Sequence, residues 1–368
     1  MTEVSPGTLA AIGGLAGGMA LGFAARWGRF CTLGAIEDAC LGGSRGRISA
    51  WGLAIAVAIA GTFALDQAGL ARITDSFYLT SPTTLLATLF GSFLFGLGMS
   101  LVGTCGYGTL ARVGGGDLKS VVTFLVLGIT AYATMNGLSA YVRVYLFDTP
   151  GQLDQPAGIA HATAGLTGGS AHVWAYLIAA GLAALALTSR DLRETPRFLT
   201  AGIIVGLAIV SGWFVTGYVA NDPFDPHRLE SFTFTGPPGD VLIYIMTATG
   251  ASLEFGIGAV VGVIVGATMT TLAQRHFRWE ACDDARFMLS GFTRENSLAR
   301  YLAGGLLMGF GGVTALGCSV GQGLSGISTA SVSSVIAVLA IAAGGYGMMR
   351  VRTSRTAAVC TPDLQPAE

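Results

Sequence analysis

Nine long apolar runs constrain the fold of this chain more than any other feature. Each is close to the roughly 20 residues that a helix needs to cross the hydrocarbon layer of a membrane. The runs lie near residues 8–27, 49–66, 83–102, 119–137, 173–188, 198–218, 252–273, 298–316 and 330–349. Because backbone groups in lipid must be hydrogen-bonded internally, we expect helices. The sequence therefore predicts an all-α polytopic membrane protein in a lipid bilayer, with about nine transmembrane helices.

The composition supports this class. Charged residues make up 11% of the chain, against about a quarter in soluble domains, and the 55 glycines are typical of membrane helices. A net charge of −1 without a basic stripe gives no reason to expect a nucleic-acid partner. The first apolar run continues without a small-residue cleavage site, so we expect a retained helix rather than a signal peptide.

Basic residues predict the orientation of the helices. With nine spans, the arginine-rich connections all fall on one side, which the positive-inside rule places in the cytoplasm. We therefore expect a bacterial inner membrane protein with its N-terminus outside, its C-terminus inside and a disordered tail over 353–368. The loops 138–172 and 219–251 then face outward, and their polar, proline-containing sequences predict ordinary exposed connections. The basic residues are Arg26, Arg29, Arg45, Arg47, Arg112, Lys119, Arg190, Arg193, Arg197, Arg275, Arg278, Arg286, Arg294, Arg350, Arg352 and Arg355.

Two glycine-rich segments, each with one cysteine, indicate an internal duplication. A shift of 213 residues places 103–108 on 316–321 and aligns the cysteines. The aligned pairs include Gly91 with Gly304, Gly98 with Gly311, Cys105 with Cys318, and Gly108 with Gly321. Interrupted segments in two corresponding halves are typical of transporter binding sites. We expect a first half-repeat over 1–150, connecting spans and loops over 151–251, and a second half-repeat over 252–352.

Four connections are too apolar for simple loops and too short for spans. They cover 28–48, 103–118, 277–297 and 317–329. We expect each to form a short re-entrant helix, because non-helical backbone at membrane depth must line a cavity or lie within protein. The N-termini of such helices favour an anion. Glycines spaced by four, such as Gly14 and Gly18, predict close helix packing, although plain glycine abundance explains them equally well.

Cysteines mark three of these connections. Cys105 and Cys318 share the duplicated frame, and Cys31 opens another segment. A lone membrane cysteine is usually a small core residue, which is how we interpret Cys40 and Cys282; Cys360 is incidental. Disulfides are disfavoured because thiols on the cytoplasmic side stay reduced. No C-x-x-C occurs and the four histidines lie outside the cysteine segments, so we expect no metal and no other cofactor.

Other polar residues accompany the cysteines. Thr109 and Gln322 follow Cys105 and Cys318 by four residues, which places them on the same helical face. Lys119 begins the next span and either attracts an anion or marks the membrane edge. Two acidic pairs are expected to hold the short helices through arginines such as Arg29 rather than to touch substrate. These pairs are Glu37 with Asp38 and Asp283 with Asp284.

These motifs resemble the YeeE/YedE family of membrane proteins, of the thiosulfate-uptake type. The resemblance extends from the first span to about Gly347, and Ser319 is a mild departure from its last motif. It implies an hourglass-shaped protein with four re-entrant helices, a path lined by three essential cysteines, thiosulfate as substrate and a small sulfurtransferase of the TusA type as partner. The matching motifs are Gly28-Arg29-Phe30-Cys31, Gly103-Thr104-Cys105-Gly106-Tyr107-Gly108 and Gly317-Cys318-Ser319-Val320-Gly321-Gln322.

Three functions fit the sequence to different degrees. We favour a transporter, not an enzyme, in which a small sulfur oxyanion exchanges weak hydrogen bonds with successive thiols. A membrane sulfurtransferase or thiol oxidoreductase would need a base or a resolving cysteine nearby in sequence, and neither is evident. A metal-ion channel would need Met or His at ligand spacing around the cysteines.

Overall fold

The computed structural model describes residues 5–42, 44–80, 85–147, 158–221, 228–275, 277 and 298–359. Within these ranges every regular element is a helix and no strand is formed. The predicted re-entrant segment 277–297, with Cys282, Asp283 and Asp284, lies outside the described residues apart from Phe277, and so does Cys360. The last helix extends to Val359, into the stretch predicted to be a disordered tail.

Each of the nine apolar runs forms a helix, which confirms the all-α polytopic fold. The helices are α1 Pro6–Trp27, α3 Gly46–Gln67, α5 Leu85–Val102, α7 Leu118–Asn136, α10 Ala171–Leu187, α12 Pro196–Phe214, α14 Phe255–Ala273, α16 Leu298–Thr314 and α17 Val332–Val359. Seven of them are long and apolar enough to cross a membrane, whereas α10 and α16 have 17 residues each. The total of nine spans therefore stays a prediction.

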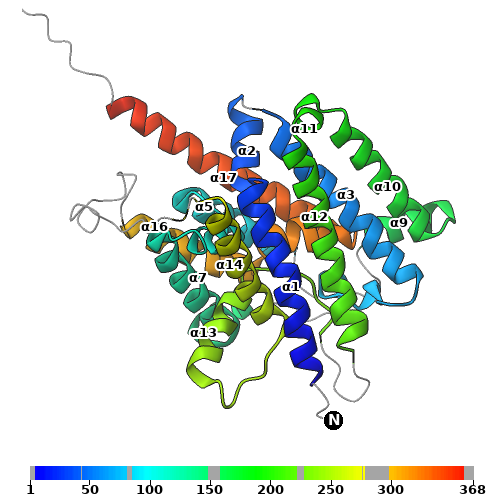
Figure 1. Cartoon of the computed structure of the whole chain (residues 1–368), viewed down its shortest axis with the longest axis horizontal. Helices are drawn as coiled ribbons and strands as arrows, with labels where there is room; N and C mark the ends of the chain where they lie inside the picture. The colour runs from blue at the N-terminus through cyan, green and yellow to red at the C-terminus, as the bar shows by residue number, and fades with distance from the viewer. Residues whose placement is uncertain are drawn as a thin grey trace, which may run out of the picture.

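Shorter helices fill the connections. Two of the predicted re-entrant segments contain α2 Thr32–Leu41 and α6 Gly106–Val113, and a third contains a π-helix, Gly321–Gly326. The others are a 3-10 helix Ile73–Asp75, α4 Phe77–Thr80, α8 Leu138–Phe147, α9 Ile159–Thr167, α11 Arg190–Glu194, α13 Pro237–Thr247 and a π-helical turn, Val215–Val219. In Figure 1, α1 runs from the N-terminus at the bottom to the end of the molecule where α2 and α11 lie.

Glycines let several pairs of helices make backbone-to-backbone contact, as two of these pairs show. On α1, Gly14 and Gly18 face the backbone of Phe255 and Ala259, so α1 and α14 run parallel. On α5, Gly91 faces the Gly311 carbonyl, and Gly98 faces that of Gly304, so α5 and α16 run antiparallel. A methyl group at any of these positions would meet main-chain atoms of the neighbouring helix. The structure thus confirms that these glycines serve close packing.

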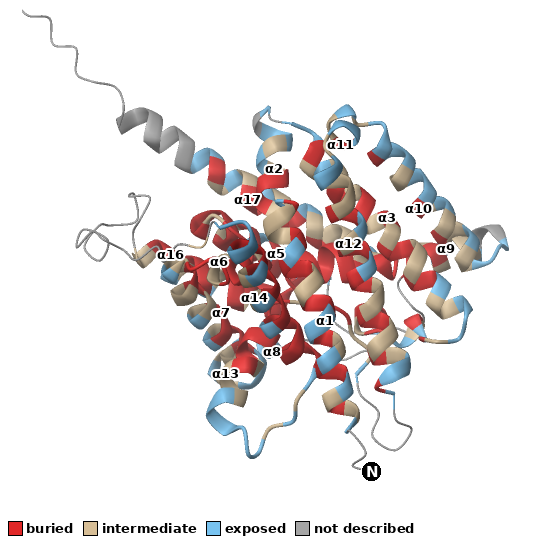
Figure 2. Ribbon diagram, viewed as in Figure 1, coloured by how far each residue is buried: buried red, intermediate tan, exposed pale blue. Residues whose placement is uncertain are grey.

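The buried residues gather at the centre of the molecule, around α5, α6 and α14 (Figure 2). Large side chains such as Phe95, Tyr107 and Trp213 are fully buried there. Many leucines on the outer helix faces are exposed instead, as Leu86 and Leu185 show. Exposed apolar residues around a buried polar centre are the pattern expected when lipid surrounds the helices.

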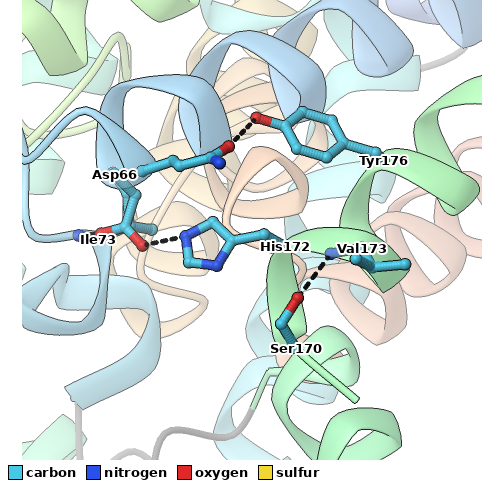
Figure 3. Close-up of polar contacts among 7 residues, drawn as sticks. Asp66, Ile73, Ser170, His172, Val173 and Tyr176 are labelled. Carbon is cyan, nitrogen blue, oxygen red and sulfur yellow. Dashed lines mark hydrogen bonds and ion pairs between the residues drawn. The ribbon is translucent and has the colours of Figure 1, made fainter.

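Polar contacts at one end fix α10 against α3 (Figure 3). Asp66 accepts a hydrogen bond of 3.0 Å from the Ile73 amide, and its other carboxylate oxygen lies 3.1 Å from Nε2 of His172. The Tyr176 hydroxyl donates to the side-chain oxygen of Gln67 over 3.1 Å. These contacts join the C-terminal end of α3 to the N-terminal end of α10, away from the cysteine segments.

Candidate functional site

The hydroxyl of Thr32 joins the three cysteine segments. It lies 3.7 Å from Sγ of Cys105 and 3.2 Å from the Ser319 hydroxyl. Thr32 directly follows Cys31, and Ser319 directly follows Cys318, so residues that are almost 300 positions apart meet at one point. Cys105 and Cys318 are fully buried, and Cys31 is half-buried. The structure therefore brings the three predicted cysteines together, whereas Cys40 lies exposed at the end of α2.

Backbone amides point at the buried sulfur atoms. Sγ of Cys105 caps α6 and accepts a bond of 3.4 Å from the Gly108 amide. Sγ of Cys318 accepts two bonds of 3.3 Å each, from the amides of Gly321 and Phe234. Amides at the start of a helical turn have no partner within the helix, so a side chain normally caps them. Here the cysteine sulfur atoms accept these bonds, and a thiol is only a weak acceptor and a weak donor.

A left-handed residue turns the chain back toward the centre in both halves. Gly103 has φ 84° and Leu316, its equivalent by the 213-residue shift, has φ 62°. Glycine adopts this conformation freely, whereas a leucine is strained there. At the end of each segment, Gly116 (φ 94°) and Ala330 (φ 57°) also have left-handed conformations, but these two residues are 214 positions apart instead of 213. The second segment thus holds one extra residue, which the π-helix Gly321–Gly326 accommodates.

The polar residues predicted beside the thiols make hydrogen bonds within the protein. The amide nitrogen of Gln322 donates to the Ala315 carbonyl over 2.6 Å, and its oxygen accepts from Ser334 over 2.6 Å. Gln322 thereby ties the π-helical segment to the residue that follows α16 and to α17. The Thr109 hydroxyl donates to the Cys105 carbonyl over 2.9 Å. Lys119 is half-buried at the start of α7, and the pathway role of all three stays a prediction.

The predicted supporting residues lie near α2. Oδ2 of Asp38 is 3.5 Å from Nε of Arg47, and this ion pair joins α2 to α3. Glu37 is exposed, and Arg29 is exposed with φ 49°, the same left-handed conformation as Arg275, which stands 246 residues further along. Asp38 thus contacts an arginine other than Arg29.

Two cavities open at opposite ends of the molecule. One, of about 560 Å³, reaches from Ala10 on α1 to Leu316 and Gly317, next to Cys318. The other, of about 640 Å³, is bordered by Arg26, Arg29 and Arg197 and by residues at the end of α14. Ala10 and Arg26 are 16 residues apart on α1, which corresponds to roughly 24 Å along the helix axis. We call these the acidic-rimmed cavity and the basic cavity, for the charges given next.

Charged residues of both signs line the acidic-rimmed cavity. The carboxylates of Glu230, Asp240 and Glu254 outnumber the two arginines, Arg143 and Arg228. Burial raises the pKa of the Glu230 carboxyl to about 7; Arg228 acts against this, and the neighbouring Glu254 and Asp240 add to it. Burial, followed by the charge of Glu254, raises the pKa of Asp240 to about 6. The charge of this cavity therefore changes between about pH 6 and pH 7.

The structure corrects the prediction for loop 219–251. Its residues 231–235 are not an exposed connection, because Phe232 and Phe234 are fully buried and the Phe234 amide contacts Cys318. Thr32 was not predicted as a site residue either. The alternation of Phe with Ser and Thr over 231–235 was the available signal for the buried segment. The position next to Cys31 was the available signal for Thr32.

Comparison with known proteins identifies the family. The sulphur transport family matches residues 27–347. The thiosulfate transporter TsuA of Escherichia coli (strain K12) is 28% identical over 336 residues, which cover 85% of this chain and 86% of that protein. The thiosulfate transporter TsuA of Spirochaeta thermophila is 26% identical over 322 residues, covering 85% and 90%. Both relatives are named as transporters and not as enzymes. The chain thus belongs to the sulphur transport family of multi-pass membrane proteins, in agreement with its YeeE/YedE motifs.

Proposed function

We propose that this protein takes up thiosulfate, or a closely related sulfur oxyanion, across a bacterial inner membrane. The observation that carries the proposal is the position of three thiol segments between two cavities at opposite ends of the molecule. Relatives that cover most of the chain are named thiosulfate transporters, which supports the choice of substrate. We place the acidic-rimmed cavity outside and the basic cavity in the cytoplasm, following the arginines.

The positions of the cysteines suggest an order along the path. Cys318 follows Gly317, which lines the outer cavity, and Cys31 follows Arg29, which lines the inner one. The Thr32 hydroxyl contacts both Cys105 and Ser319, the residue that follows Cys318. The anion would therefore meet Cys318 first, then Cys105, then Cys31. A neutral thiol is a weak donor, and weak serial sites let an ion move on where a strong site would hold it.

The basic cavity suits the release of the anion. Arg26, Arg29 and Arg197 border it, and clustered positive charge at an exit raises the local concentration of an anion or of an acidic partner surface. A sulfurtransferase of the TusA type would receive the substrate there. Binding of such a protein to the wild type and not to Arg29→Glu, measured with purified components, would support this partner.

Uptake of radiolabelled thiosulfate tests the proposed function directly. Cells without other sulfate and thiosulfate transporters are expected to accumulate label only when they express this protein. Mass spectrometry of the protein after exposure to substrate separates transport from sulfur transfer, because only the enzyme reading predicts a persulfide on a cysteine. Wild-type cells that accumulate no label would refute thiosulfate as the substrate.

Uptake is expected to decrease as the external pH rises from about 6 to about 8. Below this range Glu230 and Asp240 are neutral, and above it both add a negative charge that repels a dianion. Arg143, Arg228 and Glu254 also line the cavity. We expect the KM for thiosulfate to rise several-fold, and Glu230→Gln to flatten the profile near pH 7. A wild-type KM that is constant over this range would contradict the placement of this cavity at the entrance.

A further inference from the structure

Residues 231–235 lie between two helices without forming a regular element, and their side chains alternate between two environments. Phe232 and Phe234 point into the core, where their rings lie 4.9 Å from Phe255 and 5.6 Å from Tyr107, between centroids. The intervening residues Ser231, Thr233 and Thr235 line the acidic-rimmed cavity. A row of hydroxyl groups therefore forms part of the cavity wall.

Two of these hydroxyls have no hydrogen-bond partner within the part of the chain that the structure describes. The Ser231 hydroxyl donates to the Ile209 carbonyl over 2.8 Å, but those of Thr233 and Thr235 are buried and unpaired among the described residues. Thr235 is only 3% exposed. A buried hydroxyl without a partner destabilises a protein, so such groups call for a ligand or a functional explanation. Both threonines line the acidic-rimmed cavity.

The two threonines flank the contact with Cys318. The amide of Phe234, the residue between them, lies 3.3 Å from Sγ of Cys318. Thr233 lies against Gly321, and a Cβ atom added to this glycine would be 2.6 Å from Oγ1 of Thr233. Thr235 lies against Gly312, and a Cβ atom added there would be 2.8 Å from Oγ1 of Thr235. Side chains at these two glycines would fill the space beside the hydroxyls. The threonines and the first thiol of the path therefore form one site.

We propose that Thr233 and Thr235 bind the oxygen atoms of a tetrahedral sulfur oxyanion and present it to Cys318. This inference rests on the proposed transport function. Hydroxyl groups donate charge-assisted hydrogen bonds to an anion without a full countercharge of their own. They replace part of the hydration shell that the anion loses and still release it, which conduction requires. Arg143 and Arg228 attract the anion into the cavity, and the threonines recognise it.

Isosteric substitutions test the site. Thr233→Val and Thr235→Val remove the hydroxyl and keep the shape, whereas Thr233→Ser and Thr235→Ser keep the hydroxyl. We expect each valine variant to raise the KM for thiosulfate uptake about tenfold or more, because a hydrogen bond to a charged group is lost. The serine variants should stay near the wild type. Thr62→Val is the matched control, because the Thr62 hydroxyl on α3 is also buried and has no partner among the described residues, but Thr62 does not line the cavity.

Direct binding keeps this result separate from the choice of substrate. Purified protein in detergent is titrated with thiosulfate, sulfate and selenate, and the thermal midpoint reports both folding and binding. Binding that the wild type shows and the valine variants lose supports the site, even if thiosulfate itself is not transported. Valine variants that fold and bind as tightly as the wild type would overturn it, and so would a wild type that binds none of the three anions.

Discussion

Cys318→Ala is expected to reduce thiosulfate uptake to the background of cells without the protein. The substitution removes the sulfur atom that accepts from the Phe234 and Gly321 amides, and it leaves these two donors facing the path. Exposed amides would bind the anion more tightly than a thiol does, and a strong site within a conducting path traps the ion. The initial rate of label accumulation measures the effect, and size-exclusion chromatography confirms that the variant folds.

Cys318→Ser separates hydrogen bonding from the properties of sulfur. A hydroxyl accepts from the same two amides, but it is smaller and a stronger donor than a thiol. We expect this variant to fail as well. Cys40→Ala is the matched control, because Cys40 is exposed at the end of α2 and its loss should leave uptake unchanged. Normal uptake by Cys318→Ala would remove this thiol from the mechanism, while full activity of the serine variant would show that any acceptor suffices.

The membrane helices could be predicted from the sequence because lipid imposes one rule on all of them. Each span must be apolar and helical over its length, so windows such as 49–66 and 119–137 coincide closely with α3 and α7. Cys105 and Cys318 could be selected because the duplicated frame reproduces a geometric need, a left-handed turn followed by a helix start. Gly103 and Leu316 show that the same backbone recurs even where the residue type does not.

The inner wall of the path could not be predicted in this way. Residues 231–235 have the length and polarity of a surface loop, and nothing local indicates that Cys318 would pair with the Phe234 amide. The convergence on Thr32 depends on contacts between residues 287 positions apart. The repeat also proved less simple than one duplication. Since α5 and α16 are antiparallel but α1 and α14 parallel, the 213-residue and 246-residue matches describe different relations, and the half-repeat boundaries stay predictions.

Gly258→Ala is expected to destabilise the folded protein, although alanine normally favours a helix. A Cβ atom at Gly258 on α14 would overlap the Ala11 carbonyl of α1, and a backbone atom cannot move away as a side-chain end can. Overpacking of this kind costs about 1–3 kcal/mol or more. The loss should appear as a lower thermal midpoint in detergent and a smaller monodisperse fraction.

Gly181→Ala gives the matched control for this packing argument. Gly181 lies within α10, and a Cβ atom there would meet nothing within 4 Å. The general helix preference of alanine over glycine, about 0.5–1 kcal/mol, should then leave the thermal midpoint unchanged or slightly higher. Both variants add one methyl group to a glycine within an α-helix, and they differ only in the atoms that this methyl group faces. Equal midpoints for both would show that α1 and α14 do not approach so closely, and the cavities that these two helices border would have to be redrawn.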